Sequence, residues 1–408
     1  KLSANTHYTD ANGSLHQVTI DLRGQSSAQR DALGVMNRTV RDERNNVASS
    51  EDGRNNETSF KYDSKGNVIE ILDSLTVEAT LDNPTITWTG SVSDQWSDPG
   101  NWSGNRLPTL IDDVLIPADV DNKPIVLDGL TVSIRRLYAY QSIHLFGSQL
   151  TLVGESRLFD GVLSEDSQFS VSGATAKTTI FGEIYGTDSL FRANSKASIR
   201  MPSTRSLSRS SGITFESIGE DSLIELPVYD EDNARFGNLI LSARDSGAIS
   251  LPVVRELGPF VELKLRSDGV ISLPSLNMLS GSTLSLDGGS DLIVPQLASI
   301  DATSITASGG AKISFPLITE FELGVSGDFD TITATGAGSE ISFPNLVSVT
   351  TLESFTRITF GAMAGGAVLL PKLTSTARTS FSASGANSKI DLRSMASGAD
   401  VTFTLAGN

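Results

Sequence analysis

Eight prolines recur through the second half of the chain at the interval expected for one coil of a β-solenoid. They lie 21 to 28 residues apart, and apolar residues stand three and one positions before each, as Ile271 and Leu273 do before Pro274. Apolar residues two apart lie on the same face of a β-strand. Proline has no backbone N–H and is disfavoured inside a strand paired on both sides, so each one marks a turn at a strand end. The set is Pro202, Pro227, Pro252, Pro274, Pro295, Pro316, Pro344 and Pro371.

Further alternating pairs, such as Leu284-Ser-Leu286, follow each proline before a bend rich in glycine, serine and aspartate. Three short strands per repeat predict an all-β fold, with a right-handed parallel β-helix of about twelve coils over residues 121–408. A helical solenoid is disfavoured because its apolar residues would be three and four apart, whereas these are two apart.

Residues 1–78 contain a second, shorter repeat. Aspartates recur every 10 or 11 residues, and most open a turn-like tetrad that ends in glycine or asparagine. Aspartate favours such turns, and glycine or asparagine accepts the positive φ that ends them. Turns at this spacing predict a series of antiparallel β-hairpins. The aspartates are Asp10, Asp21, Asp31, Asp42, Asp52, Asp63 and Asp73.

The segments 60–69 (FKYDSKGNVI) and 31–47 resemble the YD repeats of Rhs proteins, although the tyrosine before the aspartate is present only at Tyr62. The resemblance implies β-sheets of the kind that wind into shells in toxin-related and cell-contact proteins. It covers about a fifth of the chain.

All three tryptophans, Trp88, Trp96 and Trp102, lie in one short segment, followed by Pro108 and the acidic pair Asp112-Asp113. This pattern resembles a segment that precedes β-helical regions in bacterial surface and autotransporter-like proteins. We expect residues 79–120 to form a junction that caps the first coil, because the open end of a solenoid needs a cover. The alternative is that the three indole rings form a platform on which sugars stack.

The composition excludes several kinds of site. The chain has no cysteine, which rules out disulfides, thiolate zinc sites and thiol nucleophiles. Its formal charge of −17 argues against nucleic-acid binding, which needs a basic face. No apolar run approaches the length of a membrane span. With only three histidines, a histidine-based metal site or catalytic triad is disfavoured.

Acidic clusters are the remaining candidates for chemistry. Asp287 with Asp291, and Asp328 with Asp330, can offer oxygen ligands to calcium, but neither pair has the spacing of an EF-hand loop. Solvated turns are the favoured interpretation, so we expect no catalytic residues, no cofactor and, unless calcium binds, no metal.

A catalytic β-helix would need acids stacked on neighbouring coils. The outward residue two positions before each proline carries scattered charges, and no two acids are adjacent. In order these residues are Arg200, Glu225, Ser250, Ser272, Ile293, Ser314, Ser342, Leu369 and Asp391, the last of a ninth copy.

We therefore expect a non-catalytic structural or adhesive rod, outside the cell or on its surface, from a Gram-negative bacterium. Its expected partners are other parts of a larger protein, further copies of itself, surface glycans or neighbouring cells. We also expect the rod to continue beyond this chain or to stack on another copy. The alternatives are a carbohydrate-active enzyme, such as a polysaccharide lyase or hydrolase, and part of an Rhs-type toxin-delivery shell.

Overall fold

The protein divides into two compact units, Lys1–Thr80 and Leu81–Asn408. The computed structural model describes residues 4–9, 15–20, 25–30, 36–41, 44, 46–51, 57–62, 68–73, 81, 83–118, 123–204, 207–209, 211–229, 237–323, 329–351 and 357–407. Apart from one turn of 3-10 helix, η1 (Pro99–Asn101), all regular structure in these residues is β-strand.

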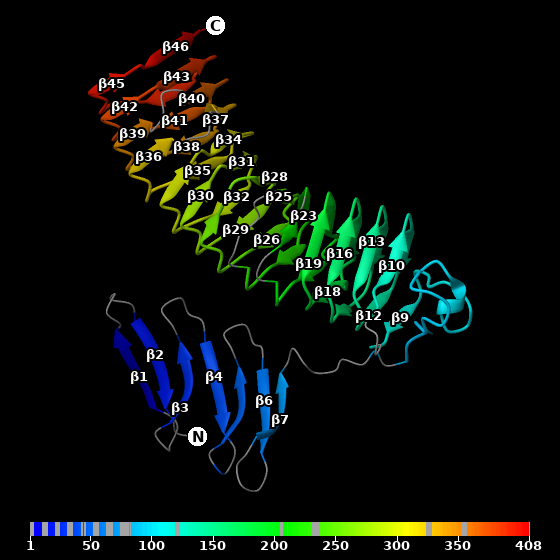
Figure 1. The fold of residues 1–408 in the computed structure, drawn as a ribbon. Helices are drawn as coiled ribbons and strands as arrows, with labels where there is room; N and C mark the ends of the chain where they lie inside the picture. The colour runs from blue at the N-terminus through cyan, green and yellow to red at the C-terminus, as the bar shows by residue number, and fades with distance from the viewer. Residues whose placement is uncertain are drawn as a thin grey trace. The chain divides into compact units, whose positions relative to one another are not determined.

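The first unit is an antiparallel sheet of seven strands that pair in chain order (Figure 1). Its first hairpin pairs Ala4 with Ile20 and Thr9 with Leu15. The turn aspartates Asp10 to Asp63 lie outside the described residues, and the YD identity of these hairpins stays a prediction. The strands are β1 (Ala4–Thr9), β2 (Leu15–Ile20), β3 (Ser26–Arg30), β4 (Met36–Arg41), β5 (Val47–Glu51), β6 (Glu57–Tyr62) and β7 (Val68–Asp73).

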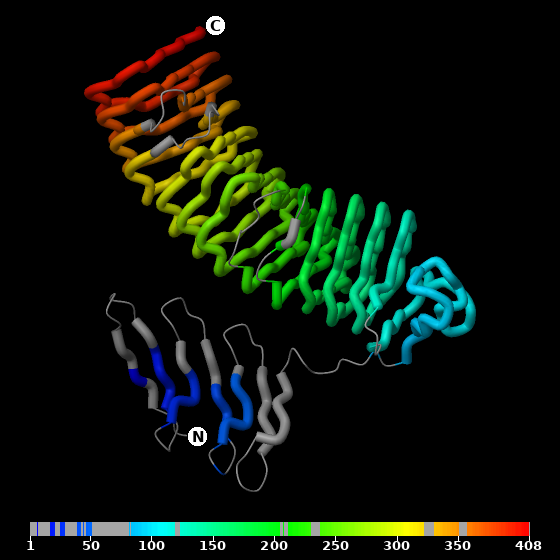
Figure 2. The backbone as a smooth tube through the Cα atoms, viewed as in Figure 1, coloured from blue at the N-terminus to red at the C-terminus, as the bar shows by residue number. Residues whose placement is uncertain are grey.

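The second unit is a parallel β-solenoid of about twelve turns. Its coils stack one on another along the unit, as the tube in Figure 2 shows. One face is an unbroken sheet of thirteen strands, each paired in parallel with the equivalent strand of the next coil. These strands are β11 (Thr131–Ile134), β14 (Gln149–Leu152), β17 (Gln168–Ser172), β20 (Ser189–Asn194), β23 (Gly212–Ile218), β25 (Asn238–Arg244), β28 (Val261–Arg266), β31 (Thr283–Asp287), β34 (Ser304–Ser308), β37 (Phe329–Thr335), β40 (Arg357–Met363), β43 (Thr379–Ser384) and β46 (Thr402–Ala406).

The strands that precede the repeat prolines form a second face together with the equivalent strands of the earlier coils. This face consists of a sheet of ten strands and a sheet of four. The first sheet contains β8 (Ile86–Thr87), β9 (Asp113–Ile116), β12 (Arg136–Ala139), β15 (Ser156–Leu158), β18 (Lys177–Ile180), β21 (Ser198–Arg200), β24 (Leu223–Glu225), β26 (Ala248–Ser250), β29 (Val270–Ser272) and β32 (Asp291–Ile293). The second contains β35 (Lys312–Ser314), β38 (Glu340–Ser342), β41 (Ala367–Leu369) and β44 (Lys389–Asp391).

The third strand position of the coils is divided among three sheets. The first contains β10 (Ile125–Asp128), β13 (Ile143–Phe146), β16 (Val162–Glu165), β19 (Ile184–Thr187) and β22 (Ser208–Arg209). The other two contain β27 (Glu256–Leu257), β30 (Met278–Ser280) and β33 (Ser299–Asp301), and β36 (Glu320–Leu323), β39 (Ser348–Thr351), β42 (Ser375–Ala377) and β45 (Ser397–Ala399).

The solenoid differs from its sequence-based prediction at its beginning. Its coils begin at β9, from Asp113, rather than near residue 121, because β9 already pairs in parallel with β12 and buries Val114 and Ile116. The first coils are also shorter than 21 residues, since Ile125 and Ile143 occupy equivalent positions. Pro117 occupies the proline position after β9, but the next three coils have aromatic residues there, so the proline spacing is interrupted before Pro202; these residues are Tyr140, Phe159 and Phe181.

Alternation along each strand builds the core. On β29, Ile271 is fully buried while its neighbours Val270 and Ser272 are only partly buried, and the same pattern recurs on β26 and β38. Each proline of the repeat lies two residues beyond the end of such a strand, at the turn where no N–H is needed. Parallel register also stacks like residues, so that Phe360 lies 5.6 Å from Phe381, measured between ring centroids.

Removing one aromatic ring from this core should lower the stability of the second unit. Phe360→Ala deletes a fully buried side chain and leaves a cavity, so we expect the free energy of unfolding to fall by about 4 kcal/mol. The measurement is urea unfolding followed by circular dichroism. Thr359→Ala, the neighbouring outward position on β40, is the matched control and should change it by less than about 0.5 kcal/mol. Equal losses in the two variants would contradict the assigned faces.

Candidate functional site

The tryptophan segment packs against the first coil. The backbone N–H of Trp88 donates to the carbonyl of Leu115 and that of Trp96 to the carbonyl of Val126, both at 2.8 Å. The rings cluster edge to face, with the Trp102 centroid 4.8 Å from that of Trp88 and 4.6 Å from that of Trp96. The segment therefore shares the core of the second unit, and its role as a cap stays a prediction.

A sugar platform would require exposed tryptophan rings, and the three rings are buried. Trp88, Trp96 and Trp102 are 5%, 1% and 1% exposed, and the indole N–H of Trp102 donates to the carbonyl oxygen of Trp96 at 2.9 Å. A sugar stacks on an open ring face, and these rings present almost none. In this arrangement the three side chains act as packing residues.

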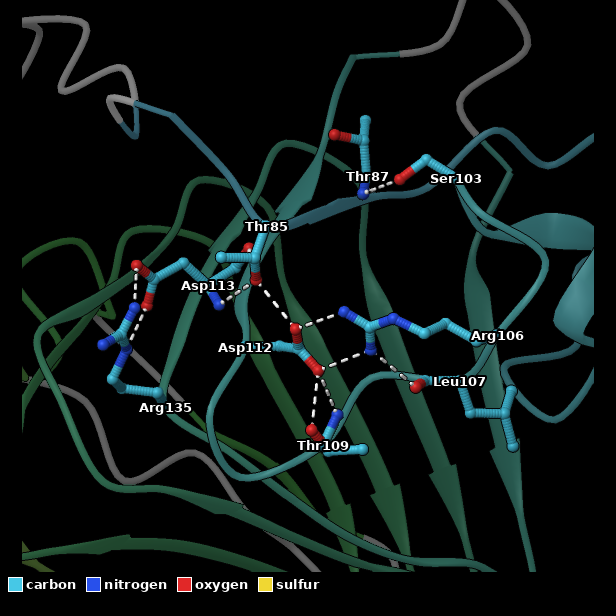
Figure 3. Close-up of polar contacts among 9 residues, drawn as sticks. All are labelled: Thr85, Thr87, Ser103, Arg106, Leu107, Thr109, Asp112, Asp113 and Arg135. Atoms are coloured by element: carbon cyan, nitrogen blue, oxygen red, sulfur yellow. Dashed lines mark hydrogen bonds and ion pairs between the residues drawn. The ribbon is translucent and has the colours of Figure 1, made fainter.

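The acidic pair that follows the tryptophans is the most densely hydrogen-bonded polar cluster near the start of the solenoid (Figure 3). Asp112 is 2% exposed. Its carboxylate accepts two hydrogen bonds from the Arg106 guanidinium at 2.6 and 2.7 Å, two from Thr109 at 2.7 and 2.8 Å, and one from the Thr85 hydroxyl at 2.8 Å. Asp112 thereby joins its own segment, residues 106–112, to Thr85.

Asp113 is equally buried and faces two arginines. Arg135 binds its carboxylate in a bidentate manner, with distances of 2.6 and 2.5 Å, and Arg136 forms a second ion pair with the same oxygens. These arginines lie at the start of β12, one coil further along. Asp113 therefore ties β9 to the next coil through side chains as well as through the backbone.

The arginines favour the ionised carboxylates. The hydrogen bonds from Arg106 hold the pKa of Asp112 well below its usual range, against the opposing effect of burial. The hydrogen bond from Arg136, supported by Arg135, lowers the pKa of Asp113 to about 2. With their oxygens already satisfied by cationic partners, both groups are suited to holding the fold together rather than to proton transfer.

Three of the four predicted calcium ligands, Asp287, Asp291 and Asp330, lie in the part of the chain that the structure describes. Within the described residues, no three histidine, aspartate or glutamate side chains are placed to hold a metal ion. One oxygen of Asp287 accepts a hydrogen bond from the Ser308 hydroxyl at 2.8 Å, and Asp330 is a buried residue of β37. Asp291 begins β32, and Asp328 lies outside the described residues.

The outward residues two positions before the first prolines align on neighbouring coils, as the sequence predicts. Arg200, Glu225 and Ser250 pair with one another in register on successive strands, and the guanidinium of Arg200 binds the carboxylate of Glu225 at 2.9 Å. The single acid in this stretch is therefore neutralised by the coil below it. No second acid adjoins it in the column.

The thirteen-stranded sheet carries charge on one part of its outer face. Glu216 lies between Arg192 and Arg244, with N–O distances of 2.7 and 3.1 Å, and Lys264 pairs with Glu262 at 2.8 Å. A shallow groove of about 630 Å³ runs over strands β20 to β28 beside these pairs. The charges are mutually compensated, so the groove has no strong preference for either sign of ligand.

From β31 to β46 the described residues of the same face carry almost no charge. Two outward columns consist of serine and threonine with a single glycine, and their members pair in register, as Thr306 does with Thr333. The columns are Thr283, Ser304, Thr331, Thr359, Ser380 and Thr402, and Ser285, Thr306, Thr333, Gly361, Ser382 and Thr404. We call this surface the hydroxyl face.

A second depression lies on the face formed by β13, β16 and β19. It has a volume of about 360 Å³ and is lined by Gly161 together with six side chains, which we call the His144 hollow: Ser142, His144, Asp160, Leu163, Glu183 and Tyr185. Sequence analysis did not single out these residues, because they come from three coils that the proline repeat does not cover. In the sequence Tyr140, Phe159 and Phe181 recur at about the length of one coil, and in the structure their rings stack.

Comparison with family models, curated proteins and solved structures gave no match for this chain. The resemblances to YD repeats and to bacterial surface proteins therefore stay predictions. Within the described residues, no helix has the length and apolar character needed to cross a bilayer.

Neutralising Asp112 should weaken the start of the solenoid. We expect Asp112→Asn to lower the free energy of unfolding at pH 7 by about 2 kcal/mol, because hydrogen bonds to a charged group are lost. A carboxylate with a lowered pKa in the folded state stabilises above its unfolded pKa of about 3.9, and this contribution is lost as the pH falls further. The difference between wild type and variant should therefore shrink below about pH 4, as measured by urea unfolding.

The control for this prediction is Asp128→Asn, which neutralises an exposed carboxylate at the end of β10. It should leave stability at pH 7 within about 0.5 kcal/mol of wild type. A loss as large as that of Asp112→Asn would mean that general charge, rather than the Arg106 contact, accounts for the effect.

Proposed function

We propose that this chain is a non-catalytic structural or adhesive rod of a secreted or cell-surface bacterial protein. The observation that carries the proposal is the unbroken thirteen-stranded sheet, in which every coil repeats the geometry of the last. At about 4.8 Å per coil, twelve coils span about 58 Å, a length suited to holding other parts of a protein away from a surface.

The hydroxyl face supports the adhesive part of the proposal. Serine and threonine hydroxyls both donate and accept hydrogen bonds, and their regular spacing suits a partner that also carries many hydroxyl groups. The face has almost no charge on a protein of formal charge −17, so a neutral glycan surface can approach it without repulsion. Neighbouring copies and other parts of a parent protein remain further partners of the rod.

Charge introduced on the hydroxyl face should weaken adhesion. We expect the double variant Thr306→Glu with Thr333→Glu to reduce retention of the full chain on insoluble neutral polysaccharide about tenfold. Each new carboxylate would lose its bound water where the polysaccharide covers the face, and this desolvation is unfavourable. The measurement is co-sedimentation, with cellulose and chitin as the probes.

The matched control is Ser314→Glu with Ser342→Glu, an outward pair in register on the proline-repeat face. It adds the same charge to neighbouring coils and should leave retention unchanged. Equal losses from both variants, or no retention of the unmodified chain, would contradict the adhesive proposal.

A carbohydrate-active enzyme is the second candidate, because the His144 hollow combines two carboxylates, an imidazole and a phenol in one depression. General acid–base chemistry on glycans uses such groups. Mass spectrometry of polysaccharides incubated with the full chain separates the two candidates. The rod proposal expects no shortened products, whereas products that disappear in Glu183→Gln would favour the enzyme.

A further inference from the structure

The shape of the His144 hollow follows from one glycine. Ser142, Gly161 and Glu183 occupy equivalent positions just before β13, β16 and β19, because Ile143, Val162 and Ile184 pair in register. A Cβ at position 161 would lie 2.6 Å from the carbonyl oxygen of Glu183, so the close approach of the next coil's backbone demands glycine there. The missing side chain in the middle coil leaves the space between its two neighbours open.

The floor and walls of the hollow are ordered before any ligand arrives. His144, Leu163 and Tyr185 form one outward column in register. The Tyr185 hydroxyl donates to the Glu183 carboxylate, although 42% of the residue is exposed. A rigid ring with an open face and a fixed hydroxyl is suited to packing against the C–H face of a sugar.

The turn that enters this face is stabilised by aromatic stacking. The ring centroid of Phe159 lies 4.3 Å from that of Tyr140 and 5.5 Å from that of Phe181. The angles between the ring planes are 9° and 6°, so the rings are nearly parallel. These rings immediately precede the residues that line the hollow. The hollow is thus preorganised, which lowers the entropic cost of binding.

The charges of the lining residues indicate which kind of ligand the hollow can bind. Asp160 and Glu183 supply two carboxylates, and none of the lining residues is a lysine or arginine. One oxygen of Asp160 accepts the N–H of Gly161 at 2.7 Å, and the structure gives its second oxygen no partner among the described residues. Burial lowers the pKa of His144, which favours its neutral form despite the nearby carboxylates.

We propose that the His144 hollow binds amino sugars whose amine is free and protonated, as in deacetylated hexosamine chains. The ammonium group would lie between the carboxylates of Glu183 and Asp160, and the ring of Tyr185 would face the sugar and contribute a cation–π contact. Ser142 and neutral His144 would hydrogen bond to sugar hydroxyls. This deepens the proposed function, on whose adhesive role it rests, by naming a class of glycan for a second face of the rod.

The test is calorimetric titration of the full chain with glucosamine trimer at pH 6 and physiological salt. N-acetylglucosamine trimer and galacturonic acid trimer are the comparison probes. We expect glucosamine trimer to bind at least tenfold more tightly than the acetylated trimer, and galacturonic acid trimer not to bind. Equal affinity for the first two probes, or tighter binding of the third, would overturn the proposal.

Variants separate the hollow from general attraction of a cation to an acidic protein. Glu183→Gln should weaken binding of glucosamine trimer about tenfold, whereas Asp128→Asn, which removes an exposed carboxylate at the end of β10 outside the hollow, should change it less than twofold. Tyr185→Phe should retain binding and Tyr185→Ala should lose it, with circular dichroism reporting whether each variant is folded. Equal weakening by Glu183→Gln and Asp128→Asn would overturn the proposal.

The outcome is independent of the hydroxyl face, which lies on another sheet. Failure of glucosamine trimer to bind, with retention on neutral polysaccharide intact, would overturn the amino-sugar site and leave the adhesive rod standing. Cleavage of the trimer would support the ligand class and overturn the non-catalytic role.

Discussion

Residue-on-residue stacking of parallel strands is the constraint on which the second unit depends. On the thirteen-stranded sheet the strands of successive coils pair with one another, so a side chain that points inward in one coil must be compatible with its equivalents above and below. The ring stack of Phe169, Phe191 and Phe215, with centroids 5.8 and 5.5 Å apart, is one result of this constraint. The same register aligns the outward residues, and any surface property therefore extends along the rod in columns.

Columns explain how a repetitive fold acquires different surfaces. On the thirteen-stranded sheet, compensated charges over β20 to β28 give way to the hydroxyl face over β31 to β46, although the backbone geometry does not change. Position in the coil fixes which way a side chain points, and its chemistry remains free to vary. The proposed adhesive surface and the His144 hollow are two uses of that freedom, on different faces.

The beginning of the solenoid is held together differently from its middle. There the tryptophan rings and the buried carboxylates of Asp112 and Asp113 add side-chain contacts between segments that the strand ladder also joins. Burying two charges is costly unless they are paired, and here three guanidinium groups and several hydroxyl and amide donors satisfy them. Both carboxylates therefore stabilise the fold through contacts within the chain.

The all-β class, the parallel solenoid and the turn position of each repeat proline were predictable from the sequence, because period-two alternation and the missing proline N–H are local properties. The outward residues from Arg200 to Ile293 were also aligned in correct register, since the proline marks the same position in each of these coils. The start of the coils, the burial of the tryptophan rings and the hollow beside Gly161 became evident in the folded structure. These features depend on which coil rests on which, and where turn lengths vary the sequence alone does not fix that stacking.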